Sequence, residues 1–278
     1  MSKFICKTCG TQFPESSTPP EGCPICQDER QYIGWDGQKW TTMEDLQEQH
    51  HNRIQQLEPG LIGIASEPAF AIAQRALLVQ TPEGNLLWDC ISLLDNQTIE
   101  AVRSAGGIKA IAISHPHYYS AMVEWSQAFN APIYLHRYEQ PWVMRSDPAI
   151  RFWNGEQFPL FGGLTLVRCG GHFPGGMVLH WPAGANGRGV LLTGDIISVV
   201  SDRRYVSFMY SFPNLIPLPA GKVRQVVSAV EALPFDRIYG AWWDREILAG
   251  AKTAVRRSAE RYIQAISGDG LEKRAEAR

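Results

Sequence analysis

Short, wholly apolar runs alternate with segments of helical spacing from about residue 61 onward. Ile108–Ile113 and Pro132–Leu135 are runs of the first kind, and they predict strands that are buried on both faces. Met122–Phe129 and Ala220–Leu233 predict helices, the second of which ends before Pro234. This alternation indicates an α/β domain in which helices cover β-rich layers.

Turn residues and helix caps mark further elements. The segment Thr81–Gly84 separates two apolar runs and predicts a hairpin. Asp95 is expected to cap one helix, and Asp244 a longer one that ends at about Ser267. The pattern also predicts strands at Leu164–Arg168, Met177–Trp181, Val190–Thr193 and Arg237–Tyr239.

The first 60 residues have a different character. Residues 1–35 contain four of the six cysteines and few aliphatic side chains, so they need a metal rather than an apolar core. Thr41 with Glu44 three residues later predicts the start of a helix, polar nearly all round, that runs to about Leu57. We therefore divide the chain into a metal-knuckle appendage (1–35), a connector helix (36–59) and a core domain (60–278).

Composition excludes several classes of protein. The chain has 278 residues, of which 45% are hydrophobic and 19% charged, a balance typical of globular proteins. Lys and Arg number 26 against 28 Asp and Glu, without a basic run, which argues against nucleic-acid and membrane partners. The most apolar long window, 60–80, is interrupted by polar residues, and the first ten residues lack an apolar signal region. We expect a cytoplasmic protein.

The N-terminal cysteines form two Cys-x-x-Cys pairs. Each pair makes a turn that points two thiolates at one centre, and two pairs supply the tetrahedral set that suits Zn²⁺. The segment resembles a short zinc ribbon or a rubredoxin-like pair of knuckles, which leaves iron open. Because four protein ligands close the shell, zinc here would be structural and iron would relay electrons. The four ligands are Cys6, Cys9, Cys23 and Cys26.

Histidines and one aspartate follow predicted strands farther along the chain. His115 and His117 come directly after Ile108–Ile113, His172 lies in the loop Gly-Gly-His-Phe-Pro-Gly-Gly, and Asp195 ends the strand that begins at Val190. Three imidazoles and a carboxylate, each in a loop after a strand, predict a site for a divalent metal.

The order of these residues resembles the metallo-β-lactamase-fold superfamily over residues 61–245. The family signature is His-x-His-x-Asp-His, a glycine-rich loop with His, a strand ending in Gly-Asp, and a terminal Gly-His. The resemblance implies a four-layer αβ/βα sandwich with the site at the edge of two facing sheets. It assigns the first metal to His115, His117 and His172, makes Asp195 the bridging ligand, and places Asp89 behind the ligands.

The chain departs from the signature at the second metal. Tyr119 stands where the family has Asp, Ser120 where it has His, and Trp242–Trp243 where the terminal His belongs. The resemblance then implies one core metal, Zn or else Fe or Mn. Ser120 and the two tryptophans are expected to line or narrow the pocket, and Tyr119 is a candidate donor to an oxyanion.

These features predict a metal-dependent hydrolase acting on a small molecule. One metal would lower the pKa of a water to roughly 7, and Asp195 would be a fourth ligand or would orient or deprotonate that water. The resemblance supplies a broad substrate class: an uncharged ester, thioester, lactone or similar compound. Two alternatives stay open: a catalytically silent binding protein, and a redox protein with a rubredoxin-like iron site. The sequence leaves the oligomeric state undecided.

Overall fold

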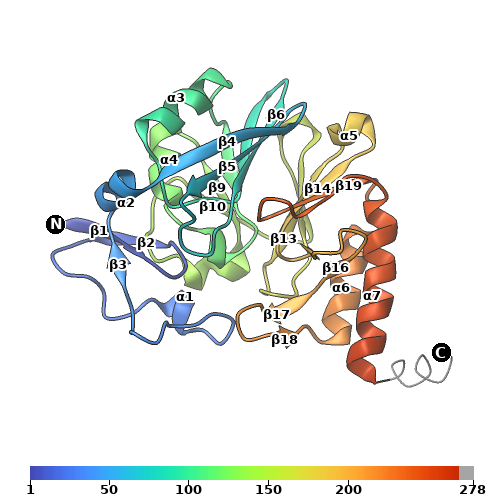
Figure 1. Cartoon of the computed structure of the whole chain (residues 1–278). Coiled ribbons are helices and arrows are strands. Elements are labelled where there is room, and N and C mark those ends of the chain that lie inside the picture. Colours follow the sequence, from blue (N-terminus) through green and yellow to red (C-terminus); the bar gives the residue numbers. More distant parts are fainter. Residues whose placement is uncertain (269–278) are drawn as a thin grey trace.

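Two β-sheets face each other in the computed structural model, which describes residues 1–268 (Figure 1). The first sheet has seven strands. In spatial order they are β10 (Ile150–Trp153), β9 (Ile133–His136), β8 (Ala110–Ala112), β7 (Gly84–Trp88), β6 (Ala76–Thr81), β5 (Leu61–Glu67) and β4 (His51–Glu58). The hairpin β6–β7 turns where Thr81–Gly84 predicts it. Strands β7 to β10 are parallel, as expected for buried apolar runs joined by crossovers.

The second sheet has six strands. In spatial order they are β11 (Gln157–Pro159), β12 (Thr165–Arg168), β13 (Met177–Trp181), β14 (Val190–Gly194), β19 (Arg237–Gly240) and β20 (Glu246–Ile247). The pair β14 and β19 is parallel, and the other neighbours are antiparallel. Two small hairpins, β15–β16 (Ser198–Val199, Val206–Ser207) and β17–β18 (Met209–Ser211, Ile216–Pro217), lie between β14 and β19 in sequence.

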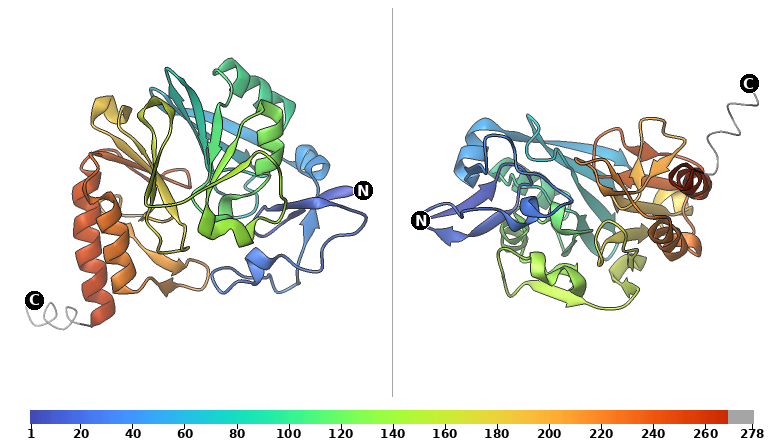
Figure 2. Two further views of the ribbon diagram at one scale, coloured as in Figure 1. Left: turned by 180° about the vertical axis from the view of Figure 1, so that it is seen from behind. Right: turned by 90° about the horizontal axis from the view of Figure 1, so that it is seen from below.

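Helices cover the outer surfaces of both sheets (Figures 1 and 2). Helices α3 (Asn96–Ser104) and α4 (Met122–Phe129) lie on the first sheet, and α6 (Ala220–Glu231) and α7 (Ala251–Ser267) pack side by side on the second. Apolar side chains of both sheets, including Trp88, Leu166 and Leu179, fill the space between them. The predicted four-layer α/β sandwich is therefore confirmed. Within residues 1–268, no helix is long and apolar enough to span a membrane.

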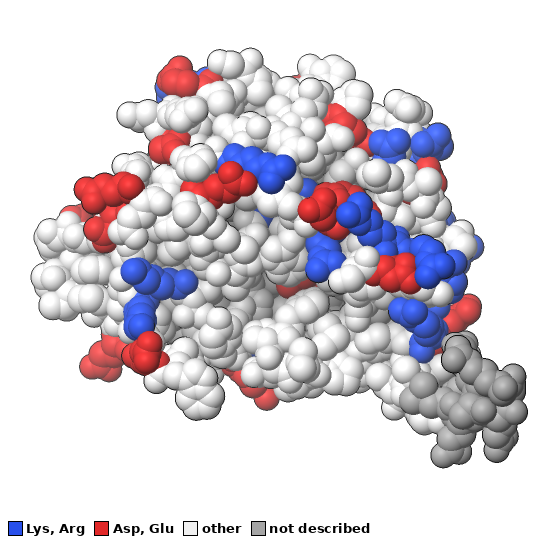
Figure 3. Space-filling model, in the orientation of Figure 1, with Lys and Arg blue, Asp and Glu red and all other residues white. Residues whose placement is uncertain are grey.

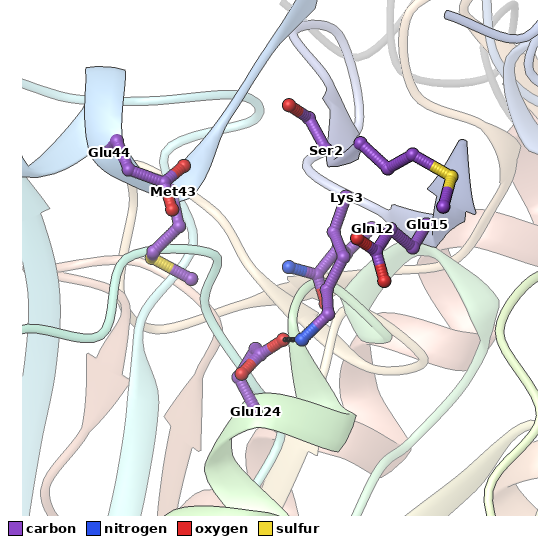
Figure 4. Close-up of a pocket in the computed structure, with 8 residues that line it drawn as sticks. Ser2, Lys3, Gln12, Glu15, Met43, Glu44 and Glu124 are labelled. Atoms are coloured by element: carbon purple, nitrogen blue, oxygen red, sulfur yellow. Dashed lines mark hydrogen bonds and ion pairs between the residues drawn. The ribbon is translucent and has the colours of Figure 1, made fainter. Parts of the chain in front are cut away.

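The N-terminal segment (residues 1–35) packs against the core domain. It contains β1 (Ser2–Cys6), β2 (Gln12–Ser16) and the short helix α1 (Pro24–Gln27), and β1 also pairs with β3 (Trp40–Thr41). Lys3 forms an ion pair of 2.8 Å with Glu124 of α4, beside a pocket between β1, α2 (Met43–Gln49) and α4 (Figure 4). The Ser92 hydroxyl donates to the Gly10 carbonyl at 2.7 Å. The segment is thus joined to the core by side-chain and backbone contacts.

The predicted connector helix is wrong beyond its first two turns. Helix α2 has a capping box of Thr42 and Asp45, one residue later than expected, and is followed at once by strand β4. The second half of the predicted helix instead forms β4, because β5 offers it backbone hydrogen-bond partners. Its polar side chains are tolerated there, since an edge strand has a face in contact with solvent. His51, expected on this helix, lies exposed on β4.

The start of the last helix also differs from the prediction. Asp244 does not cap it: strand β20 intervenes, and Gly250, in a left-handed conformation, precedes the first residue of α7. Pairing of β20 with β19 extends the second sheet by one strand, which the short sequence Glu246–Ile247 does not reveal. The helix ends at Ser267 as expected. Residues 269–278 of the predicted core domain lie outside the described residues.

Candidate metal centres

Four cysteine sulfurs meet at the centre of the N-terminal segment. All four thiols are buried and unoxidised, and their sulfurs lie within 4.8 Å of one another. The pairs Cys6–Cys26 and Cys9–Cys23 are each 3.6 Å apart. Sulfurs placed about 2.3 Å from a tetrahedral metal lie about 3.8 Å from one another, so this arrangement fits one metal ion.

Local backbone geometry makes the two knuckles. The Gly10 amide donates to the Cys6 carbonyl at 2.8 Å, and its φ of +83° is the left-handed value that favours glycine. The Cys26 amide donates to the Cys23 carbonyl at 2.9 Å in the second turn. Hydrogen bonds from the other cysteines lower the pKa of Cys6, while the same contacts raise that of Cys26. The pKa of Cys9 is also raised, so Cys6 ionises more readily than Cys9 and Cys26, and the thiolate is the form that binds metals.

The second cluster lies at the edge where the two sheets meet. Ligand atoms of His115, His117, His172 and Asp195 lie within 4.8 Å of one another. The three imidazole rings are 5.0 Å apart between every pair of centroids. His172 Nε2 is 3.2 Å from His117 Nδ1, and His115 Nε2 is 3.3 Å from Asp195 Oδ1. The structure thus brings together the four residues that the sequence predicts.

Burial sets the charge of this cluster. It lowers the pKa of His172 to about 4 and holds those of His115 and His117 well below their usual values, so the rings are neutral at neutral pH. Neutral imidazole is the form that binds metals. Within residues 1–268, buried Nε2 of His115 and Oδ1 of Asp195 have no hydrogen-bond partner, which a metal would satisfy. The donor set fits a divalent ion.

Asp89 and Ser114 support His115 from behind. The Asp89 carboxylate accepts a 2.7 Å hydrogen bond from the Ser114 amide, and the Ser114 hydroxyl lies 3.0 Å from His115 Nδ1. When Nδ1 donates to this hydroxyl, the lone pair of Nε2 faces the cluster. Burial raises the pKa of Asp89 to about 7. Asp89 lies where the sequence expects it, but Ser114 provides the contact to the ring.

Replacing Ser114 by alanine is expected to weaken metal binding at the histidine cluster by about tenfold or more, because the ring of His115 loses its orienting partner. Competition with a chromophoric chelator measures the affinity. Ser126→Ala is the matched control, since Ser126 is also buried and makes one hydrogen bond, to Ala131, within the α4 region. Equal affinities of the two variants would contradict this role.

The residues at the second-metal positions point elsewhere. The Tyr119 hydroxyl is directed at the Glu139 carbonyl, 3.4 Å away, and the side chain is buried. Ser120 Oγ donates to the Cys90 carbonyl at 3.3 Å and accepts from Gln74. Asp244 directly follows Trp242–Trp243 and could have replaced the lost terminal histidine, but it is exposed and faces Arg203 at 3.8 Å. Asp244 belongs to neither of the metal-ligand groups found among residues 1–268.

An open cleft of about 520 Å³ lies beside the cluster. Phe212 and Trp242 belong to its wall and also approach the site, since Phe212 meets His172 edge to face and Trp242 meets Tyr118 in the same way. On the face seen in Figure 3, acidic and basic side chains are interspersed. The full lining of the cleft is Ser198, Val199, Val200, Ser201, Phe212, Trp242, Trp243 and Arg245.

Two arginines lie close to the ring of Trp243. The guanidinium of Arg53 lies 4.4 Å from its ring centroid and that of Arg75 lies 5.1 Å away. A Cβ at Gly63 of β5 would approach this ring to 2.8 Å, so glycine makes room for it. Trp243 thus packs over the first sheet as well as lining the cleft.

Three side chains near the site were missed by the sequence analysis. Arg75 is buried and binds the carbonyl of Gly240 at the end of β19, and Arg30 of the N-terminal segment contacts the His172 loop. Glu139 is buried and accepts from the Gly175 amide of the same loop; burial raises its pKa to about 7. Each contacts residues more than 30 positions away, and no local pattern marks such partners.

Comparison with known proteins agrees with this geometry. A family model described as the metallo-beta-lactamase superfamily matches residues 71–242. The uncharacterized protein YmaE of Bacillus subtilis (strain 168) is 51% identical over 271 residues, 97% of this chain and 98% of that protein.

Solved structures share the fold. A B3 metallo-beta-lactamase with an active-site glutamic acid is 17% identical with a TM-score of 0.56, covering 84% of this chain and 96% of its own. A metallo-beta-lactamase from Pontibacter korlensis is 13% identical with a TM-score of 0.55, covering 76% and 99%. The matched family model spans more than half of the sequence and includes every residue of the histidine cluster, so this chain belongs to the metallo-β-lactamase superfamily.

Proposed function

We propose that this protein is a metal-dependent hydrolase of an uncharged ester, thioester, lactone or similar small molecule. Superfamily membership supports metal-dependent hydrolysis at a general level. The observation that carries the proposal is the convergence of three neutral, buried imidazoles and one carboxylate on a single point. Zinc in such a set acts as a Lewis acid and lowers the pKa of a water to about 7.

The protein's own residues would position and deprotonate the attacking water. Asp195 Oδ1 lies 3.3 Å from His115 Nε2, so its carboxylate faces the same point as the ring nitrogens. Within residues 1–268 its Oδ1 has no hydrogen-bond partner, so this oxygen is available to a metal ion or to the proton of a water. We propose that Asp195 serves as the fourth metal ligand or as the base that deprotonates the water. We propose that Asp89 supports the site by holding Ser114, which in turn orients His115.

The substrate class follows from the missing second-metal ligands. Tyr119 and Ser120 are turned toward backbone carbonyls, so we propose that the core cluster holds one metal ion rather than two. The aromatic side chains of Phe212, Trp242 and Trp243 supply apolar surface along the cleft. A site of this kind favours uncharged substrates over phosphodiesters. We propose that Tyr119 supports the wall of the site through Glu139 rather than donating to an oxyanion.

We propose further that the four cysteines hold structural zinc. The buried, closed set of four thiols supports a site without an open position for chemistry. We also propose a cytoplasmic location, because paired Cys-x-x-Cys motifs in a reducing compartment serve as metal ligands.

Metal analysis and a substrate panel test the proposal together. We expect the full-length protein to be colourless, to contain two ions per chain, and to hydrolyse uncharged esters, thioesters or lactones better than β-lactams or phosphodiesters. A chelator should abolish turnover, and added zinc should restore it. One ion per chain without turnover would favour the silent binding protein. A red-brown protein would instead favour the rubredoxin-like iron site, and efficient phosphodiester turnover would refute the one-metal site.

A further inference from the structure

The chain that follows the second knuckle crosses from the N-terminal segment to the second half of the core. Residues 28–31, here called the bridging segment, lie beside the hairpin β17–β18 (Figures 1 and 2). Asn214 Nδ2 donates to the carbonyls of Glu29 and Gln31, each at 3.1 Å. Ser211 Oγ donates to the Arg30 carbonyl at 3.1 Å, and Tyr210 donates to the Glu29 carboxylate. Three consecutive residues are therefore fixed to this hairpin.

Arg30 points from the bridging segment to the histidine loop. Its guanidinium lies 3.9 Å from the centroid of the Phe173 ring, and Nη1 donates to the His172 carbonyl at 3.3 Å. Asp28 holds the same guanidinium through Nε and Nη2. The Arg30 side chain is only 11% exposed, so solvent does little to weaken these contacts.

Phe173 lies between Arg30 and the three histidines and contacts all of them. Its ring centroid is 5.4 Å from that of His115, 5.0 Å from that of His117 and 5.1 Å from that of His172. The ring is fully buried. Arg30 lies over the Phe173 ring, and this ring contacts His117 and His172 edge to face and His115 at a tilt. Arg30, Phe173 and the three imidazoles thus form one continuous set of contacts that begins just after the cysteine cluster.

We infer that Arg30 is a positioning residue: it couples the folded four-cysteine segment to the histidine cluster by fixing Phe173 and the backbone of His172. This inference rests on one part of the proposed function, the binding of a metal by the histidine cluster, and does not depend on hydrolysis. A planar guanidinium is required, because a lysine ammonium cannot stack on Phe173 while binding both oxygens of Asp28. The N-terminal segment is then part of the core site.

The chain contains a matched control for Arg30. Arg204 binds Asp202, two residues before it, through Nε and Nη2 at 2.9 and 2.8 Å, as Arg30 binds Asp28. It also approaches an aromatic ring, that of Tyr205, at 5.9 Å. Its hydrogen bonds do not reach the His172 loop. Loss of Arg204 therefore removes an equivalent arginine–aspartate pair beside an aromatic ring and leaves the contacts of the histidine cluster unchanged.

Chelator competition with Zn²⁺ on the full-length variants tests the inference. We expect Arg30→Ala and Arg30→Lys each to weaken the core site by about tenfold or more, with the cysteine site still loaded, whereas Arg204→Ala leaves both affinities unchanged. Core affinity within twofold of wild type in Arg30→Lys would overturn the inference. This variant keeps the charge and the alkyl stem, so it provides the decisive comparison if Arg30→Ala does not fold.

Hydrogen exchange of residues 170–176 separates this inference from the proposed function. Arg30→Lys should speed exchange in this loop while Arg204→Ala does not, whether or not the core holds metal. A wild-type core without metal would end the proposed hydrolase and leave this readout intact. Unchanged exchange in Arg30→Lys would overturn the positioning role even in a fully active hydrolase.

The cysteine site provides an independent test of the coupling. The sequence by itself predicts that residues 1–35 form a unit independent of the core domain. On that basis Cys23→Ser should lower the stability of the protein without changing the chemistry of the histidine cluster. The contacts of the bridging segment lead us to expect weaker Zn²⁺ binding at the histidine cluster in Cys23→Ser as well. Wild-type core affinity in a folded Cys23→Ser protein would show that Arg30 acts without the cysteine metal and would overturn the coupling.

Discussion

Replacing His172 by alanine is expected to remove the core metal and to leave the ion of the cysteine cluster in place. His172 Nε2 lies 3.2 Å from His117 Nδ1, and within residues 1–268 it is the third histidine of the cluster with His115 and His117. Two imidazoles and a buried carboxylate bind a divalent ion far less tightly than the complete set. Metal content should fall from two ions per chain to one, and hydrolysis should fall to background.

His180→Ala is the control for this experiment. His180 is also buried in the second half of the core, but its Nε2 contacts the Pro234 carbonyl at 2.8 Å and no metal-ligand group. Its loss should leave two ions per chain. Unchanged metal content in His172→Ala, measured by elemental analysis after dialysis, would show that the core ligands are wrongly assigned or that the core binds no metal.

Replacing Arg75 by alanine is expected to reduce the free energy of unfolding by about 3–5 kcal/mol. The wholly buried guanidinium forms an ion pair of 2.7 Å with Glu246 and donates to the Gly240 carbonyl at 3.2 and 3.1 Å. Removal leaves a carboxylate that is 12% exposed and a buried carbonyl without their partner.

Urea unfolding monitored by tryptophan fluorescence measures this loss. Arg256→Ala is the control, because Arg256 forms an ion pair with Glu231 in which both side chains are about half exposed, and its removal should change stability little. Arg75→Met, which fills the space without a charge, should be intermediate. A loss in Arg75→Ala no larger than in the control would mean that the buried ion pair contributes nothing to holding β20 against the core.

The sequence was most informative where a metal-binding residue type directly follows the apolar pattern of a buried strand. The strands before His115 and Asp195 are short, buried and mostly apolar, and loops after such strands gather at one sheet edge. Four metal ligands could therefore be placed from their order along the chain. Asp95 also caps α3 as predicted, because its carboxylate accepts from the Thr98 amide within one turn.

Features that depend on distant partners could not be predicted. Strand β4 forms because β5 offers it backbone partners, although its own residues are mostly polar. Arg75 looks like an interruption of an apolar run, yet its partner carbonyl at Gly240 is 165 residues away. The direction of the Tyr119 side chain is set by its contact with Glu139, which a comparison of sequence signatures does not contain.

The bridging segment has a consequence for the order of events during synthesis. Its partners Ser211 and Asn214 lie 181 and 185 residues after Arg30 and Glu29. At about 5–20 residues per second, the cysteines leave the ribosome roughly 10–40 s before that hairpin is made. The two knuckles have time to close around their metal while the partner surface does not yet exist. The bridging segment can therefore complete the contacts of the His172 loop only late in synthesis, although it is itself among the first parts of the chain to be made.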